Sequence, residues 1–127
     1  MSYSPRDAWL IPLLKRMSKR PGMFLGNERV GTLATYLQGY GQARVDLGVP
    51  EFGEGEETLL VDFEKWLAAE MGDTRDVAWP TLIATADPGD HNVRTFFHRL
   101  EEFLQQRGQC LSRLVEKEQS PEGDSKP

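Results

Sequence analysis

The sequence predicts an all-α fold, a single compact domain of four main helices plus one short helix. Apolar residues recur at spacings of three and four in several stretches, which is the period of a helix with one buried face. No stretch alternates apolar and polar residues convincingly, as a half-buried strand would. The 127 residues suit one core, and 39% of them are hydrophobic. We expect the domain to span residues 1–116, followed by a disordered tail at 117–127 that has nothing to bury.

The first predicted helix begins after Ser4, which can cap it, and Pro5, which suits the first helical position. Its apolar residues at helical spacing are Trp9, Leu10, Leu13, Leu14 and Met17. Pro12 lies within this run. We therefore expect a kink or a division into two pieces, because proline lacks an N–H and clashes with the preceding turn.

This helix is expected to end at Pro21-Gly22, in a turn with the glycine at positive φ. The apolar residues 23–25 are then expected in an extended loop that places side chains in the core. A second helix is predicted over residues 28–46, with Asn27 as its cap, from the periodic residues Val30, Leu33, Leu37, Tyr40, Arg44 and Leu47. Its three glycines, each costing about 1 kcal/mol relative to alanine, indicate close packing of another backbone or room for a ligand or partner: Gly31, Gly39 and Gly41.

Two more main helices and a short one follow an acidic loop at residues 51–57. A helix over residues 58–71 is predicted from Leu59, Leu60, Phe63, Trp66, Leu67 and Met71. Pro80, after Trp79, favours a short helix there rather than a strand. After a break at 87–90, with Asp90 or Asn92 as cap, the last main helix is predicted from Val93, Phe96, Phe97, Leu100, Phe103 and Leu104.

Composition narrows the classes of function. The net charge is −5, with an excess of bases in residues 1–29 and eleven acids against two bases in residues 51–90. This balance disfavours nucleic acid as a ligand and permits a basic protein partner. The single cysteine, Cys110, favours a reducing cytoplasm. We expect no membrane span and no signal peptide, because no window is apolar and long enough.

No pattern of catalytic or metal-binding residues is present. His91 and His98 are seven residues apart and lack the spacing of a zinc site. Adjacent acids on a helix, such as Glu101 and Glu102, point in different directions and do not form an acid–base pair. The chain contains neither a GxSxG nucleophile elbow nor a GxxxxGK[ST] phosphate loop. We therefore expect no enzyme, no cofactor and no metal.

The segment from Leu13 to Gly26 resembles the opening of the gyrase-B type ATPase domain. That family has a helix, then arginine-proline-glycine-methionine-aromatic-aliphatic-glycine, then a second helix. The family's glutamate and aspartate-asparagine pair of the ATP site are absent from the matching stretch, residues 36–42. The chain also lacks the later glycine-rich lid and a pattern for the sheet. The resemblance is therefore local and implies no ATPase activity.

A wider stretch, residues 8–104, resembles a group of small bacterial helical proteins. The motifs that carry this resemblance are Arg20 to Gly26, Leu37-Gln38-Gly39-Tyr40, Phe63-Glu64-Lys65-Trp66-Leu67, Trp79, and the Phe-Phe-x-x-Leu-x-x-Phe run at 96–103. Small acidic bacterial domains of this kind are often immunity proteins, which bind and block a toxin. By analogy of class, the resemblance implies a similar role here.

Two hypotheses of function follow. The favoured one is a non-enzymatic, immunity-type protein that binds and neutralises a basic toxin through an acidic surface of Glu51, Glu54, Glu56 and Glu57. The alternative is a regulator that binds a small molecule or nucleotide at the loop from Arg20 to Gly26. In that alternative Arg20 pairs with an anion beside Met23 and Phe24, and Tyr36 or Tyr40 stacks on the ligand. An enzyme of another type is the least favoured, and the oligomeric state is left open.

The basic residues before this loop have two explanations. Lys15, Arg16, Lys19 and Arg20 suit contact with phosphates, and they equally suit the C-terminal end of a helix, where cations favour the dipole.

Overall fold

The computed structural model describes residues 8–53 and 55–114, and these residues form helices and no strand. The prediction of an all-α fold is confirmed, although the number of helices differs from the expected five. The helices are α1 (Leu10–Met17), α2 (Pro21–Leu25), α3 (Val30–Asp46), α4 (Leu59–Met71), α5 (Trp79–Ala86) and α6 (Val93–Gln106). One further helical turn lies at residues 111–114. The expected tail at 117–127 lies outside the described residues.

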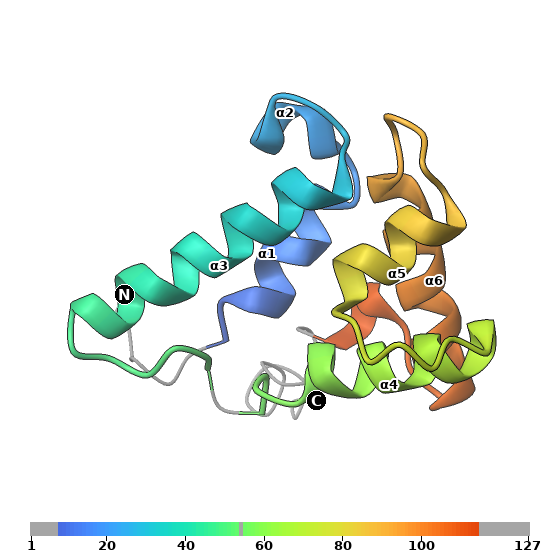
Figure 1. The fold of residues 1–127 in the computed structure, drawn as a ribbon. Helices are drawn as coiled ribbons and strands as arrows, with labels where there is room; N and C mark the ends of the chain where they lie inside the picture. The colour runs from blue at the N-terminus through green and yellow to red at the C-terminus, as the bar shows by residue number, and fades with distance from the viewer. Residues whose placement is uncertain (1–7, 54, 115–127) are drawn as a thin grey trace, which may run out of the picture.

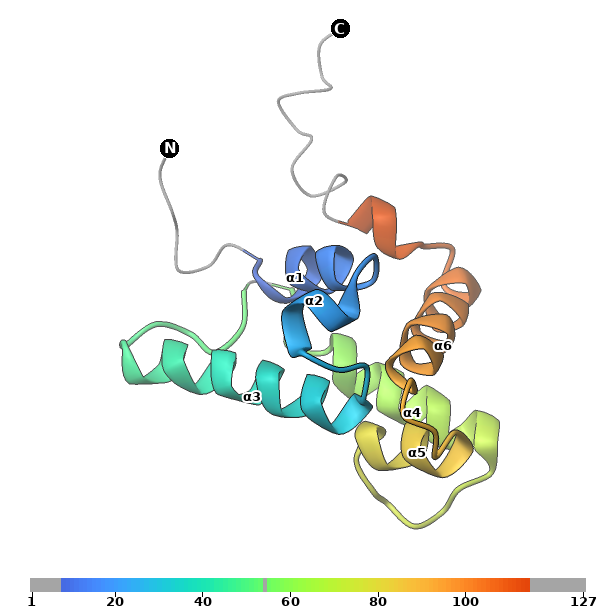
Figure 2. The ribbon, with the colours of Figure 1, turned by 90° about the horizontal axis from the view of Figure 1, so that it is seen from above.

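The helices form two groups joined by the long helix α3 (Figures 1 and 2). Helices α1 and α2 lie on one side of α3, and α4, α5 and α6 pack together near its N-terminal end. The C-terminal half of α3 projects away from this second group, and the following loop returns from its tip to α4 (Figure 1). We call residues 36–47 the α3 arm.

The core is one continuous cluster of buried apolar side chains from α1, α3, α4, α5 and α6. Phe63 of α4 lies near its centre, with its ring edge-on to Phe96 at 5.5 Å and to Phe103 at 5.8 Å between centroids. Helix α2 has no fully buried residue and contributes only Phe24 and Leu25, which are partly buried. Within the described residues, no helix is long and apolar enough to cross a membrane.

The expected kink at Pro12 is absent. Helix α1 begins at Leu10, so Pro12 occupies its first turn, where an N–H has no partner within the helix. Proline therefore neither breaks a helical hydrogen bond nor bends the helix here. The proposed start at Ser4 and Pro5 falls outside the described residues.

The turn expected at Pro21-Gly22 is also wrong. Pro21 is the first residue of α2, a position that suits its fixed φ, and Gly22 lies inside that helix. The glycine with positive φ is Gly26, at 79°, which ends α2 in the left-handed conformation. Residues 23–25 are consequently helical and not extended, and Met23 points to solvent with 70% of its surface exposed.

The later elements agree with the sequence. Helices α3, α4 and α6 lie within two residues of the predicted ranges or starting positions, and the short helix after Trp79 is present. Gly72 ends α4 with φ of 65°, as expected for a glycine at that position.

Candidate functional site

The carboxylate of Glu56 lies inside the protein, at the N-terminal end of α1. It is 0% exposed and accepts hydrogen bonds from the backbone N–H groups of Trp9 at 3.1 Å, Leu10 at 3.1 Å, Ile11 at 2.8 Å and Gly53 at 3.3 Å. Because Pro12 has no N–H, the bonds from Trp9, Leu10 and Ile11 occupy the open donors at the start of α1. The expectation that Glu56 belongs to an acidic surface is therefore wrong, since no partner reaches it.

Other helices are also capped by side chains from distant positions. Asn92 directly precedes α6, yet its Oδ1 accepts the N–H of Val30 at the start of α3 at 2.7 Å. Its Nδ2 donates to the carbonyl of Asp87 at 2.9 Å. Asn92 is thus a cap, as expected, but for α3 and not for α6. Asn27, the expected cap of α3, instead accepts the N–H of Arg29 in a local turn.

The remaining predicted acids do not form one surface. Glu51 and Glu57 are exposed, while Glu54 lies outside the described residues. Glu51 lies against α3, because a Cβ built on Gly41 would be 3.0 Å from the Cγ of Glu51. Of the three helical glycines, Gly41 is therefore packed closely, whereas Gly31 and Gly39 face open space. The close packing expected from the sequence holds only for Gly41, and the neighbour is a side chain and not a backbone.

Glu51 has an aromatic neighbour that sequence spacing did not reveal. Its carbonyl oxygen accepts a hydrogen bond from the indole Nε1 of Trp9 at 2.8 Å. The same indole stacks on the ring of Tyr40, with centroids 4.3 Å apart and planes 11° apart, and also on Phe52 at 5.9 Å. Trp9 is buried, whereas 42% of Tyr40 is exposed. The structure thus brings Tyr40 and Glu51 together through Trp9.

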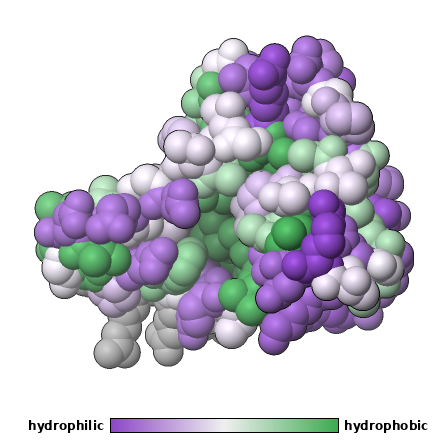
Figure 3. All heavy atoms as spheres, viewed as in Figure 1, coloured by the Kyte–Doolittle hydropathy of each residue, from purple (hydrophilic) through white to green (hydrophobic). Residues whose placement is uncertain are grey.

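Tyr40 belongs to an exposed apolar face of the α3 arm. Tyr36 and Tyr40 are four residues apart, which places them on one side of the helix, and Leu47 directly follows its last residue. Their exposed fractions are 37%, 42% and 80%. Hydrophobic side chains are visible at the projecting end of the arm in Figure 3. We call these three residues together with Glu51 the arm surface.

The other predicted site residues gather elsewhere. Arg20, Met23 and Phe24 line a concavity of about 280 Å³ between the end of α1 and α2, together with Lys15, Arg16 and Lys19. We call it the basic pocket. The sequence placed these six residues close together, but the folding of α2 that brings them around one concavity was not predicted. Tyr36 and Tyr40 are not among its lining residues.

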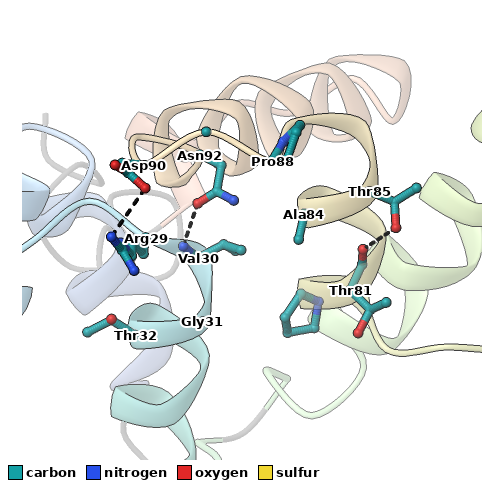
Figure 4. Close-up of a pocket in the computed structure, with 12 residues that line it drawn as sticks. Arg29, Val30, Gly31, Thr32, Thr81, Ala84, Thr85, Pro88, Asp90 and Asn92 are labelled. Atoms are coloured by element: carbon teal, nitrogen blue, oxygen red, sulfur yellow. Dashed lines mark hydrogen bonds and ion pairs between the residues drawn. The ribbon is translucent and has the colours of Figure 1, made fainter.

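A larger cleft of about 650 Å³ lies between the start of α3 and α5 (Figure 4). Several of the polar groups that line it pair with one another. Arg29 forms an ion pair with Asp90 at 3.2 Å, and Asn92 holds the N–H of Val30. The hydroxyl of Thr85 donates to the carbonyl of Thr81 at 2.8 Å. The sequence did not predict this cleft. The polar groups named here bond to one another, so their positions are explained by the fold and need no ligand.

The described residues do not assemble a metal centre. They contain no group of three or more His, Cys, Asp or Glu side chains placed to hold a metal ion. His91 contacts Glu28 at 2.9 Å and His98 contacts Glu102 at 3.5 Å, both at the surface. Arg94 donates to Glu28 at 2.7 Å, and this bond, with the smaller contribution of His91, lowers the pKa of the Glu28 carboxyl. The pairs of Glu28 with His91 and Arg94 join the segment before α3 to the start of α6.

The sequence matches no known family model, and comparisons with curated proteins and with solved structures yield no match either.

Proposed function

We propose that the protein is a non-enzymatic binding protein of the immunity type, which binds a basic toxic enzyme through the arm surface. The observation that supports this most directly is the exposure of Tyr36 and Tyr40 on one face of α3, which projects from the body, and of Leu47 directly after its end. Large contiguous apolar patches on a protein surface are typical of interaction sites. Tyrosine is also enriched among residues that dominate binding energy.

The arm surface is well ordered before any partner binds. Tyr40 is held by its stack on Trp9, and Trp9 is fixed by burial and by its hydrogen bond to the Glu51 carbonyl. A side chain that is already fixed loses little rotamer freedom on association. This arrangement supports Tyr40 as an anchor of the interface, with its phenol ring presented to the partner.

Charge supports a basic partner. The chain carries a net charge of −5, which attracts a basic protein during diffusional encounter. Glu51 places one carboxylate against Gly41, the residue that follows the aromatic anchor Tyr40 in α3. With Glu56 buried, the acidic contribution within the described part of the loop rests on Glu51 and Glu57. The proposed interface is accordingly more aromatic than the sequence suggested.

The immunity-type role itself rests on analogy. The small size, the acidic charge and the resemblance to small bacterial helical proteins all support it. The partner would then be an enzyme whose activity is blocked when the arm surface covers part of it.

The test combines capture of a partner with neutralisation of its toxicity. The purified full-length protein would be used to capture proteins from its source cell at low and at high salt. The captured protein would then be expressed in a host with wild-type chain or with variants Leu47→Ser or Glu51→Gln. We expect wild type to restore growth, and each variant to bind roughly tenfold more weakly or worse.

Glu70→Gln is the matched control, because Glu70 is an exposed acid on α4, away from the arm. It should bind like wild type. The proposal fails if no captured protein is toxic, or if Leu47→Ser and Glu51→Gln bind as tightly as Glu70→Gln does.

A further inference from the structure

The basic pocket combines charge with an apolar floor. Met23 and Phe24 of α2 supply the apolar part, and basic side chains from the end of α1 and from the α1–α2 link surround it. Met23 is 70% exposed, so its side chain is open to contact by a ligand. A ligand that suited this surface would therefore need both an anionic and an apolar part.

Three of the four rim cations are available to a ligand. Within the part of the chain that the structure describes, the side chains of Arg16, Lys19 and Arg20 have no hydrogen-bond or ion-pair partner. Attraction to the helix dipole of α1 explains the position of only some of these basic residues. Arg16 lies in the last turn of α1, but Lys19 and Arg20 follow its last residue, Met17, and the effect falls off beyond the last turn.

The size of the pocket limits the ligand. At about 280 Å³ it is at the lower end of the range of about 300–1,000 Å³ typical of small-molecule sites. It suits a single ring system, not a helix or an extended chain. The net charge of −5 also disfavours long polyanions, because they sense the charge of the whole molecule. Nucleic acid and an anionic membrane are therefore poorer candidates than a small ligand.

The geometry points to a binding site for a small organic phosphate, that is, a phosphate monoester attached to a flat apolar ring. The phosphate pairs with Arg16, Lys19 and Arg20, and the guanidinium groups match phosphate oxygens in a bidentate manner. The ring lies on Met23 and Phe24. This site is separate from the arm surface and is independent of the proposed immunity-type function.

The test uses phenyl phosphate as the probe, with phenol and inorganic phosphate as its two halves. Binding to the full-length protein would be measured by calorimetry and by the NMR signal of the Met23 methyl group. We expect phenyl phosphate to bind at least roughly tenfold more tightly than either half and to shift the Met23 signal. Raising the salt concentration should weaken this binding.

Two exposed cations provide matched variants. Arg20→Gln removes a rim charge, and Lys65→Gln removes an exposed charge on α4 that does not line the pocket. Arg20→Gln should weaken binding roughly tenfold, as expected for the loss of a charged hydrogen bond, and Lys65→Gln should leave it unchanged. Undetectable binding, an unmoved Met23 signal or equal losses in the two variants would overturn the assignment.

Discussion

At the scale of single residues, Glu56 and Asn92 decide where helices begin. Each has its polar atoms in the interior and accepts backbone N–H groups from an element distant in sequence. In each case a side chain supplies an acceptor that the helix cannot provide for its own first turn. These two residues therefore join parts of the chain that are distant in sequence.

Removal of the Glu56 carboxylate should destabilise the protein strongly. Glu56→Ala leaves four N–H groups without their acceptor, and we expect a loss of at least about 3 kcal/mol in the free energy of unfolding. Glu56→Gln, which keeps one acceptor oxygen, should lose less. Urea denaturation followed by tryptophan fluorescence would measure both. The control is Glu57→Ala, at an exposed neighbour, which should change stability by less than about 0.5 kcal/mol. Equal effects of Glu56→Ala and Glu57→Ala would contradict the capping role.

At the scale of elements, two glycines of α3 should respond differently to the same substitution. Gly39 faces open space, so Gly39→Ala should stabilise the protein by about 1 kcal/mol through helix propensity alone. Gly41→Ala should stabilise less, because the new methyl group would lie 3.0 Å from the Cγ of Glu51 and displace that side chain. Thermal denaturation of the two single variants would measure the difference. A larger gain for Gly41→Ala would show that Glu51 does not pack there.

The stability that the Glu28 ion pairs provide, between the α2–α3 link and α6, should depend on pH. Arg94 and, to a smaller extent, His91 lower the pKa of Glu28 below its ordinary value of 4.5. A lowered pKa means that the ionised carboxyl is favoured in the folded state. Its contribution to stability is therefore present above about pH 4.5 and is lost as the pH falls through the folded-state pKa.

Comparison of wild type with Glu28→Gln would test this dependence. Wild type should lose stability as the pH falls from about 6 to about 3, and the variant should lose less, because it has no carboxyl group to protonate at this position. Urea midpoints measured across this range would report the difference. The ion pairs would have no role in stability if both proteins showed the same dependence on pH.

At the scale of the whole molecule, the two groups of helices share one core. Trp9 lies beside α1 and the arm, while Trp66 and Trp79 lie in the second group, and the buried cluster includes residues from both. We expect a single cooperative unfolding transition, because separation of the groups would expose apolar surface on each. The variant Trp66→Phe/Trp79→Phe leaves Trp9 as the only fluorescent tryptophan. Its fluorescence midpoint in urea should coincide with that of circular dichroism, and an earlier change at Trp9 would indicate that α1 and the arm unfold first.

The candidate sites show when residues that are close in sequence also form one site in the structure. Arg20, Met23 and Phe24 were predicted as one group and do lie around one pocket, because they are close in sequence. The four acids at 51–57 were also neighbours in sequence, yet Glu56 is buried and Glu51 lies against α3. In an irregular loop, adjacent side chains have no fixed relation to one another, so their exposure cannot be inferred from spacing.

The sequence by itself determined the helical class, the ranges of α3 and α4 and the start of α6, because a period of 3.6 residues and glycine at helix ends are local properties. Only the tertiary structure decided where α1 begins, which carboxylate caps it and which exposed groups lie together. Those features depend on contacts such as that between Ile11 and Glu56, which are 45 residues apart. Such contacts form because buried N–H groups need acceptors, and any suitable side chain that the fold brings near can provide one.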